Sequence, residues 1–271
     1  MSAPVKVITG QEQLPSRSTA AVNVLRRVDD PDTSVADLAA AIGTDPVFAA
    51  RVIRVANSTY YGLSGRVSTL TFAVSIIGFQ SIRGLAVAAA AGLDGPNSVP
   101  EGFWLAAATA AAAADLMAPL MDADPGDAFC LGLLHTLGTA LLHQRQPTAR
   151  LCLPAPAEGV DLLQSELDDY GIDHARAGAE VLIAWKFPPH LSDVIARHHN
   201  PTLADAPPLE RVLSAARTLT NLALPNDQTP DRQCSEYDLA RLTNGRLATH
   251  DLDSLITALR QRAETLLTAL T

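Results

Sequence analysis

Histidine side chains are the residues of this sequence that could carry catalytic chemistry. The 271-residue chain contains 7 of them, and a neutral imidazole is a good ligand for transition metals. Three or four imidazoles brought together by folding can hold a zinc ion even without a carboxylate. Signatures of other enzyme classes are absent, since the sequence has no GxGxxG after a strand pattern, no GxxxxGKS or GxxxxGKT, and no GxSxG.

A second group of side chains indicates binding, and it follows a predicted helix start. Asp45 and Pro46 supply a capping carboxylate and a ring that presets the backbone for a first helical turn. Arg51 and Arg54 stand three residues apart on the helix that follows, so they lie on one face. A turn with two tyrosines closes the segment. We expect a face that meets an anionic partner to be formed by Arg51, Arg54, Asn57, Tyr60, Tyr61, Arg66 and Arg83.

The distribution of charge supports an anionic partner for the first third of the chain. Residues 1–92 hold 8 basic and 6 acidic side chains, whereas residues 93–271 hold 12 and 23, and the net charge is −9. No acidic residue lies between Asp45 and Asp94. Such an asymmetry can mark a binding site, but the arginines can equally pair with acidic groups or cover apolar surface. The negative net charge argues against generic nucleic-acid binding.

Composition and periodicity predict an all-α fold that positions these residues. Hydrophobic residues make up 48% of the chain and aromatic residues only 4%, so the core must be mostly Ala, Leu, Val and Ile. Alanine is the strongest helix former, and Gly and Pro lie mainly between the periodic runs. We expect an extended arm or short leader over residues 1–13, followed by helices over residues 18–28, 34–43, 45–56, 69–77, 81–91, 103–117, 127–144, 159–170, 174–187, 189–199, 209–222, 237–242 and 251–270.

Other features bound the organisation and location of the protein. A loop rich in Gly, Pro, Asn and Ser at residues 92–100 is the predicted subdomain boundary. The most apolar stretch, residues 105–114, is too short to span a bilayer, so we expect no membrane contact. The N-terminus has no signal-peptide pattern. Cysteines are odd in number and far apart, which fits a reduced, cytoplasmic protein with free thiols at Cys130, Cys152 and Cys234.

The segment DPVFAARVIRVANSTYYGL, residues 45–63, carries a resemblance to a known family. Together with Ser68, Ala73 and Gly78 it is similar to the HDOD domain, a bacterial all-helical relative of the HD metal-dependent phosphohydrolases, and weaker matches continue to about residue 200. The resemblance implies an all-α, HDOD-type multi-helical bundle over residues 12–222. An N-terminal helical subdomain, 12–92, would pack on a degenerate HD-like subdomain, 100–222, and residues 223–271 would form a C-terminal helical extension.

The same resemblance implies a metal centre that has lost its acidic ligands. Histidines fall where the HD family keeps metal ligands, and these vestigial candidates are His135, His174, His198 and His199. GLLHTLG resembles the family's GLLHDIG, in which the aspartate supplies anionic oxygens that can bridge two metals. Thr136 stands at that position, Ala106 replaces an earlier histidine, and a later aspartate, expected near Arg217, is missing. No other Asp or Glu within residues 102–222 sits at a matching position. We therefore expect no catalytic residue, no stoichiometric metal and no cofactor; His135 would instead bond a backbone carbonyl inside the core.

Three functions remain open at this point. The resemblance implies a non-catalytic regulatory or signalling scaffold or adaptor that binds a protein partner through the arginine-rich face. Residues 35–56 also read as a helix-turn-helix, whose second helix would place Arg51 and Arg54 on duplex DNA, and the tyrosines beside them suit a single strand or a nucleotide. The third function is a residual metal-dependent phosphohydrolase. The sequence identifies neither the partner nor the oligomeric state.

Overall fold

Helices dominate the part of the protein that the structure describes, as the sequence predicts. The computed structural model describes residues 18–63, 65–93, 97–145, 160–200, 202, 204–225, 231–247 and 252–271, and no strand occurs within these ranges. The elements are α2 (Thr19–Arg27), α3 (Val35–Ile42), α4 (Pro46–Ala56), η1 (Thr59–Tyr61), α5 (Leu70–Ile77), α6 (Phe79–Ala90), α7 (Phe103–Met117), η2 (Ala118–Met121), α8 (Pro125–Leu134), α9 (Leu137–Arg145), α10 (Val160–Tyr170), α11 (His174–Ala184), α12 (Pro189–Ala196), α13 (Pro208–Ala223), α14 (Arg232–Leu242) and α15 (Leu252–Leu270). The arm predicted over residues 1–13 lies outside the described residues.

Local capping side chains explain where several helices begin. Ser34 accepts a hydrogen bond from the Asp37 backbone N–H, and Asp37 bonds back to the Ser34 backbone, which makes a capping box. Asp45 accepts hydrogen bonds from the first turn of α4, directly before Pro46. Because each of these contacts is local in sequence, the predicted starts of α3 and α4 agree with the structure.

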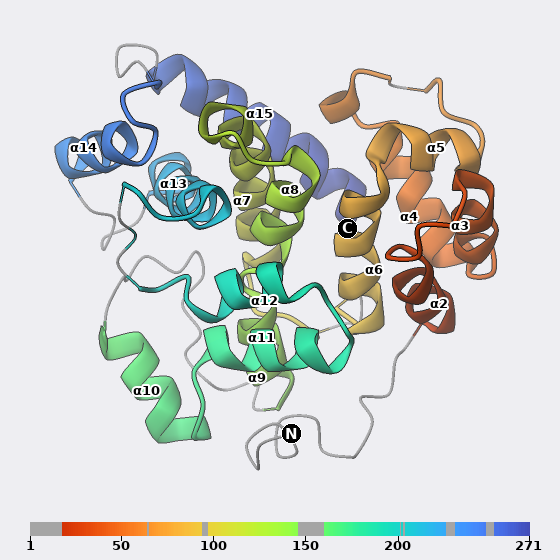
Figure 1. Cartoon of the computed structure of the whole chain (residues 1–271), viewed down its shortest axis with the longest axis horizontal. Helices are drawn as coiled ribbons and strands as arrows, with labels where there is room; N and C mark the ends of the chain where they lie inside the picture. The colour runs from red at the N-terminus through yellow and green to blue at the C-terminus, as the bar shows by residue number, and fades with distance from the viewer. Residues whose placement is uncertain are drawn as a thin grey trace.

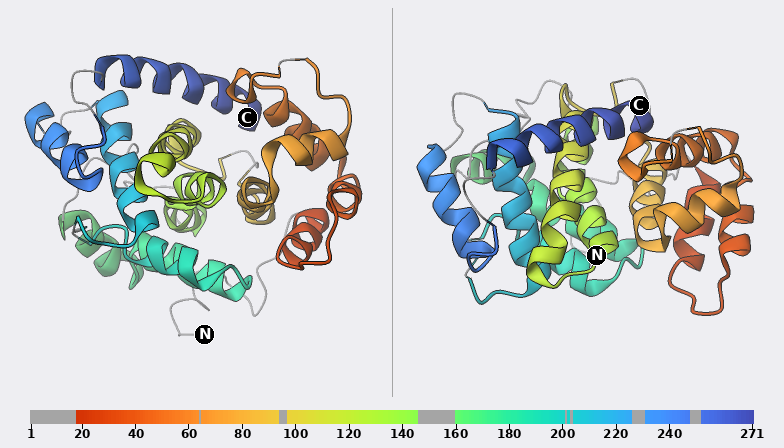
Figure 2. Two further views of the ribbon diagram at one scale, coloured as in Figure 1. Left: turned by 45° about the horizontal axis from the view of Figure 1, so that its top comes forward. Right: turned by 90° about the horizontal axis from the view of Figure 1, so that it is seen from above.

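The alanine-rich helix α7 lies at the centre of the fold. It packs against α8, α13 and α15, and α8 also packs against α6. Figure 2 shows α7 and α8 side by side with the remaining helices around them. The backbones approach closely at Gly132, where an added Cβ would lie only 2.4 Å from the Ala110 carbonyl oxygen. Small residues thus replace interdigitating large side chains at this contact.

One predicted helix, residues 127–144, is instead two helices, α8 and α9, and this prediction was wrong. The chain leaves α8 at His135, whose backbone N–H still bonds the Leu131 carbonyl, and begins α9 at Leu137. Both His135 and Thr136 are buried at the break. The apolar pattern of the segment runs through the break, so periodicity alone predicts a single helix.

The C-terminal helix α15 is part of the core. It packs against α7, α13, α4 and η1, so it spans from the last helices back to the first ones. Figure 1 shows α2 to α5 grouped at one end of the molecule, with α15 extending toward them from the α14 end. Leu266 and Leu270 join the main hydrophobic cluster, whereas Leu252 and Leu259 join a second one around α13 and α14. The helices predicted for the extension are present, although α14 starts earlier, at Arg232, than the predicted residue 237.

One helical stretch, Phe103–Met121, is long and apolar enough in composition to cross a membrane. It is longer than the 105–114 segment singled out in the sequence. Two-thirds of its most apolar window (67%) is buried against other parts of the protein. A core helix of a globular fold passes the same test, and α7 is packed as such a helix.

Candidate functional site

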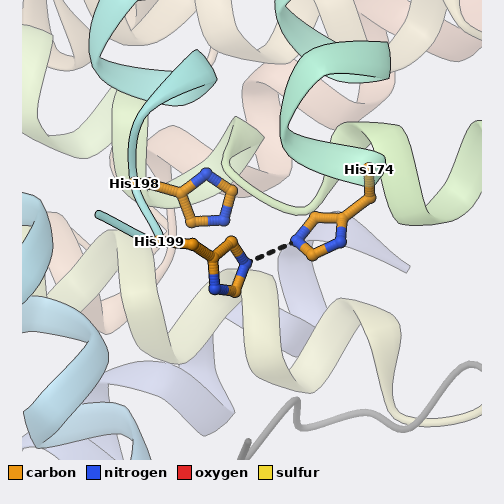
Figure 3. A group of neighbouring side chains, drawn as sticks. All are labelled: His174, His198 and His199. Carbon is orange, nitrogen blue, oxygen red and sulfur yellow. Dashed lines mark hydrogen bonds between the residues drawn. The ribbon is translucent and has the colours of Figure 1, made fainter. Parts of the chain in front are cut away.

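Four histidines from separate parts of the sequence meet in one centre. His135 ends α8, His174 is the first residue of α11, and His198 and His199 follow α12. Ring centroids are 5.6 Å apart for His135 and His198, 5.3 Å for His174 and His198, and 4.3 Å for His198 and His199. Figure 3 shows His174, His198 and His199 with one ring nitrogen each turned toward a common space. Ligand atoms of these three residues lie within 4.8 Å of one another.

A close helix contact holds this centre together. Gly138 on α9 and Gly178 on α11 face each other, and a Cβ added to Gly138 would lie 1.8 Å from the His174 carbonyl oxygen. Only glycine lets the two backbones come this near. The contact places the start of α11, and with it His174, against the helix that follows His135.

Hydrogen bonds at the Nδ1 atoms fix the tautomers of three rings. His135 Nδ1 lies 2.8 Å from the Gly132 carbonyl oxygen, and His198 Nδ1 lies 2.6 Å from the Ile195 carbonyl oxygen. A carbonyl only accepts, so both Nδ1 atoms carry the proton. His174 Nδ1 lies 2.7 Å from a carboxylate oxygen of Glu166, which also accepts the His174 backbone N–H at 2.8 Å. In each of these rings Nε2 is left as the unprotonated nitrogen.

An arginine completes the centre from α13. One Arg217 terminal nitrogen donates to the His198 carbonyl oxygen, and the other lies 3.4 Å from His199 Nδ1. Because guanidinium only donates, His199 Nδ1 is an acceptor and its Nε2 carries the proton. That Nε2 lies 2.8 Å from His174 Nε2. The result is one consistent chain of donors from Arg217 through His199 and His174 to Glu166.

The centre is built for neutral imidazoles. Burial lowers the pKa of His135 to about 3 and that of His199 to about 2, and the Arg217 charge acts in the same direction on both. Burial, followed by the Arg217 charge, holds the pKa of His198 well below its ordinary range. The lowered pKa values keep the rings of His135, His198 and His199 uncharged beside the guanidinium of Arg217.

The residues present do not fit a metal ion as they are arranged. Two nitrogens bound to one tetrahedral zinc would stand roughly 3.3 Å apart, given bonds of about 2.0–2.1 Å. His199 and His174 are at 2.8 Å, which is a hydrogen bond. Arg217 brings a positive charge to the same rings, and the one carboxylate that contacts a histidine of the centre within the described residues, Glu166, is engaged with His174 Nδ1.

Thr136 and Ala106 stand where the resemblance expects metal ligands. Thr136 is buried, and its hydroxyl has no hydrogen-bond partner among the described residues. Ala106 is buried in α7. Neither residue can supply the anionic oxygen that a hydrolytic metal centre uses.

Two residues of the centre, Glu166 and Arg217, were missed as functional candidates. A signal for Glu166 exists in the sequence: it stands three residues after Leu163 and four before Tyr170, so it shares the inward face of α10. Arg217 was noted only as the place of a missing aspartate. Its contact with two histidines depends on the tertiary packing of α13, which no local pattern reveals.

The arginine-rich face divides into inward and outward residues. Arg51 and Arg83 are buried, with 7% and 3% of their surface exposed, so they cannot form the predicted surface with Arg54. Arg83 pairs with Asp29, lies 4.0 Å from Asp127 and stands over the Phe187 ring. Of the four predicted arginines, Arg54 and Arg66 are exposed.

The polar residues after α4 also have structural partners. Asn57 bridges the loop behind it: its side chain donates to the Ile53 and Val67 carbonyl oxygens and accepts from the Val67 backbone N–H. Tyr60 donates to an Asp115 carboxylate oxygen at 2.7 Å and packs against Tyr61 with ring centroids 4.9 Å apart. Burial raises the pKa of both tyrosines above the ordinary value. These tyrosines are therefore not free stacking surfaces.

Arg54 lines a groove between α4 and α15. The groove runs between the end of α4 and the last helix, and it is lined by Arg54, Asn57, Ser58, Thr59, Gln261, Glu264, Thr265, Thr268 and Ala269. Thr59 and Thr265 join across it by a 3.0 Å hydrogen bond. Its lining is mostly polar and uncharged, with one arginine and one glutamate.

Comparison with known proteins finds a matching domain family and a curated relative. The HDOD domain profile matches residues 14–201 of this chain. A protein of Treponema pallidum (strain Nichols) is 25% identical over 223 residues, which cover 78% of this chain but 42% of that protein. The chain thus spans less than half the length of that curated relative.

Solved structures show the same fold. A Shewanella amazonensis SB2B protein, described as a candidate phosphohydrolase, is 26% identical with a TM-score of 0.74, covering 100% of this chain and 99% of that one. A Marinobacter aquaeolei VT8 protein, described as a candidate signal transduction protein, is 23% identical with a TM-score of 0.68, covering 99% of this chain and 63% of that one.

Proposed function

The chain belongs to the HDOD domain family, and we propose that it is a non-catalytic signalling module that acts by binding a protein partner. The observation that carries this proposal is the closure of the histidine centre by Arg217, which donates to His198 and lies beside His199. Metal-assisted hydrolysis needs cations held by anionic ligands, with an open position for water. The centre of this protein instead contains a resident positive charge and neutral rings.

Arg54 and Arg66 are the predicted contact residues that remain available for a partner. Both are exposed, and they belong to a part of the sequence with no acidic residue between Asp45 and Asp94. An acidic surface on the partner would complement them, and such rim charges act mainly on association rate and specificity. Arg51 and Arg83 are buried and are not part of the proposed surface; Arg83 pairs internally with Asp29.

Capture of the partner tests this surface. The partner protein is captured from a lysate of the source organism. The Arg54→Ala, Arg66→Ala double variant should retain at least tenfold less of it than the wild type does. A matched control is Arg26→Ala, Arg27→Ala, which removes two exposed arginines from α2 of the same subdomain. Equal retention by wild type and both double variants would place the contact elsewhere.

Nucleic-acid binding is the weaker alternative in this geometry. Helices α3 and α4 do follow each other across a short turn, but α4 exposes one arginine, Arg54, and buries the other, Arg51. A groove-binding helix needs several contacts to bases and phosphates. Fluorescence anisotropy with labelled oligonucleotides over a salt series decides the point: affinity that falls steeply with salt would favour nucleic acid over a protein partner.

Hydrolysis is the second alternative, favoured by the convergence of His174, His198 and His199 within 4.8 Å. It is tested by turnover of a generic phosphodiester in the presence of manganese, iron or zinc. We expect no rate above that of His174→Ala. A rate that disappears in His174→Ala would contradict the proposed function.

A further inference from the structure

Arg217 stands against the His199 ring and the His198 backbone, beside three imidazoles that are otherwise arranged for a metal ion. We infer that Arg217 is a built-in cation that excludes divalent metal from a latent site formed by His174, His198 and His199. This inference rests on the proposed non-catalytic function and adds the residue that enforces it. The geometry supports it in three steps.

The first step is the orientation of the rings. Metal-binding histidines generally donate one N–H to a carboxylate or carbonyl, which points the other nitrogen at the metal. His174 does so toward Glu166, and His198 does so toward the Ile195 carbonyl oxygen. Both rings therefore direct an unprotonated Nε2 away from their supporting partner. Two of the three ligands are already prepared for a metal.

The second step is the effect of Arg217 on the third ring. Its guanidinium lies 3.4 Å from His199 Nδ1, so this nitrogen must accept and the proton must sit on Nε2. The same Nε2 is the atom 2.8 Å from His174 Nε2. Arg217 thus fixes the tautomer in which His199 presents a hydrogen, and not a lone pair, to the common space. Removing the guanidinium frees His199 to move its proton to Nδ1.

The third step concerns the charge of Arg217 and the access of a cation to the imidazoles. Arg217 places a fixed positive charge beside the His199 ring and against the His198 backbone carbonyl oxygen. This charge repels any cation that approaches the rings. The space beside the centre is a pocket lined by Val194, Arg197, His198, Asn200, Thr202, Glu210, Leu213 and Ser214. Leu213 and Ser214 stand four and three residues before Arg217, on the same face of α13. Because His198 already lines this pocket, we expect a shortened Arg217 side chain to open space between the pocket and the other two imidazoles.

Zinc and cobalt titrations of Arg217 variants test the inference. Arg217→Ala removes the charge and the donor, and Arg217→Met removes both while keeping side-chain volume if the alanine variant is unstable. The matched control is Arg197→Ala, which deletes a neighbouring charge that is paired with Glu210 and is 54% exposed. Cobalt is the spectroscopic probe, because tetrahedral coordination by nitrogen gives visible absorption that a hydrated ion lacks. All proteins are titrated without an affinity tag.

We expect Arg217→Ala or Arg217→Met to bind one equivalent of zinc about 100-fold more tightly than wild type and Arg197→Ala. The bound cobalt should show tetrahedral absorption, and adding His174→Ala to either variant should abolish it. Equal zinc affinity in wild type and in the Arg217 variants would overturn the inference. Phosphodiester turnover is measured separately: a rate lost in His174→Ala contradicts the proposed function, whereas unchanged affinity without turnover overturns only the role of Arg217.

Discussion

The histidine centre and the segment around α4 are both polar regions that suggest chemistry in the sequence, and they differ in what folding leaves exposed. In the histidine centre, hydrogen bonds link Arg217 through His199 and His174 to Glu166. In the α4 segment, folding sorts the arginines: Arg83 becomes a buried ion-pair partner, and Arg54 stays at the surface. A polar residue that is already engaged by internal partners is not available for binding or catalysis.

The two regions also use their internally paired charges differently. Arg217 and Glu166 stand at the two ends of a hydrogen-bonded chain that runs through His199 and His174. Arg83 joins three helical regions, because it reaches Asp29 after α2 and Asp127 on α8 from its own helix α6. The first arrangement places a positive charge beside the imidazoles, and the second supports the fold on which the exposed arginines lie.

Lowering the pH should reduce the free energy of unfolding more than any substitution considered below, because it acts on several rings of the histidine centre at once. The folded-state pKa values of His135 and His199, about 3 and about 2, and that of His198 lie below the unfolded value of 6.5. The stability that they contribute is therefore present above pH ~6.5 and is lost as pH falls below it, because the unfolded state binds protons first. Between pH 7.5 and 5.5 the loss is roughly 4 kcal/mol, at about 1.4 kcal/mol for each of three rings.

Urea denaturation at the two pH values measures this loss. His198→Gln should reduce it, since one depressed imidazole is removed. An unfolding free energy that stays constant over this range would show that the rings titrate freely.

A side chain added at the close contact between α9 and α11 should disrupt the histidine centre by forcing apart the helices that hold it. Gly138→Ala places a Cβ 1.8 Å from the His174 carbonyl oxygen, so the helices must separate, and we expect a cost of at least about 3 kcal/mol. Gly178→Ala is the matched control, because its Cβ would meet the Gly138 nitrogen at 3.1 Å. Thermal denaturation should rank Gly138→Ala well below Gly178→Ala; similar melting temperatures would mean that the contact is looser than described.

In the segment around α4, replacing a buried arginine should lower the free energy of unfolding more than replacing an exposed one. Arg83→Ala removes a buried charge whose partner, Asp29, is 44% exposed and can be hydrated, so we expect a cost of about 2–3 kcal/mol. Arg54→Ala and Arg66→Ala should change stability by less than about 0.5 kcal/mol, as exposed substitutions usually do. Chemical denaturation compares the three variants. Equal effects of Arg83→Ala and Arg54→Ala would remove the distinction between buried and exposed arginines.

Tyr60→Phe should have a smaller effect in that region. The substitution keeps the ring against Tyr61 and Phe129 but removes the hydroxyl that donates to Asp115. Loss of one partly buried hydrogen bond should cost about 1–2 kcal/mol. The measurement is again denaturation, and no change would show that water replaces the hydroxyl. The variant should still capture the protein partner, since Tyr60 is not part of the proposed surface.

The fold was predictable where its signals are local. Ser34 and Asp45 cap helices through residues two or three positions away, so the sequence places those helix starts correctly. The break between α8 and α9 was not predictable, because the apolar pattern continues through it and the His135 ring meets His198, which is distant in the sequence.

The candidate site shows the same limit. Resemblance places the four histidines, but the burial of Arg83 depends on Asp29, which is 54 positions away in the sequence. The role of Arg217 depends on histidines 18 and 19 positions away. Glu166 could have been found from its place on the inward face of α10. Such pairings are set by tertiary packing, and periodicity records only which face is buried.

The metal content of the protein, purified without a tag from its source organism, tests the central claim most directly. Elemental analysis should find less than ~0.1 equivalent of zinc, manganese or iron per chain, because Arg217 holds the place beside the imidazoles where a cation would bind. About one equivalent of any of these metals, lost on substitution of His174, would contradict the account.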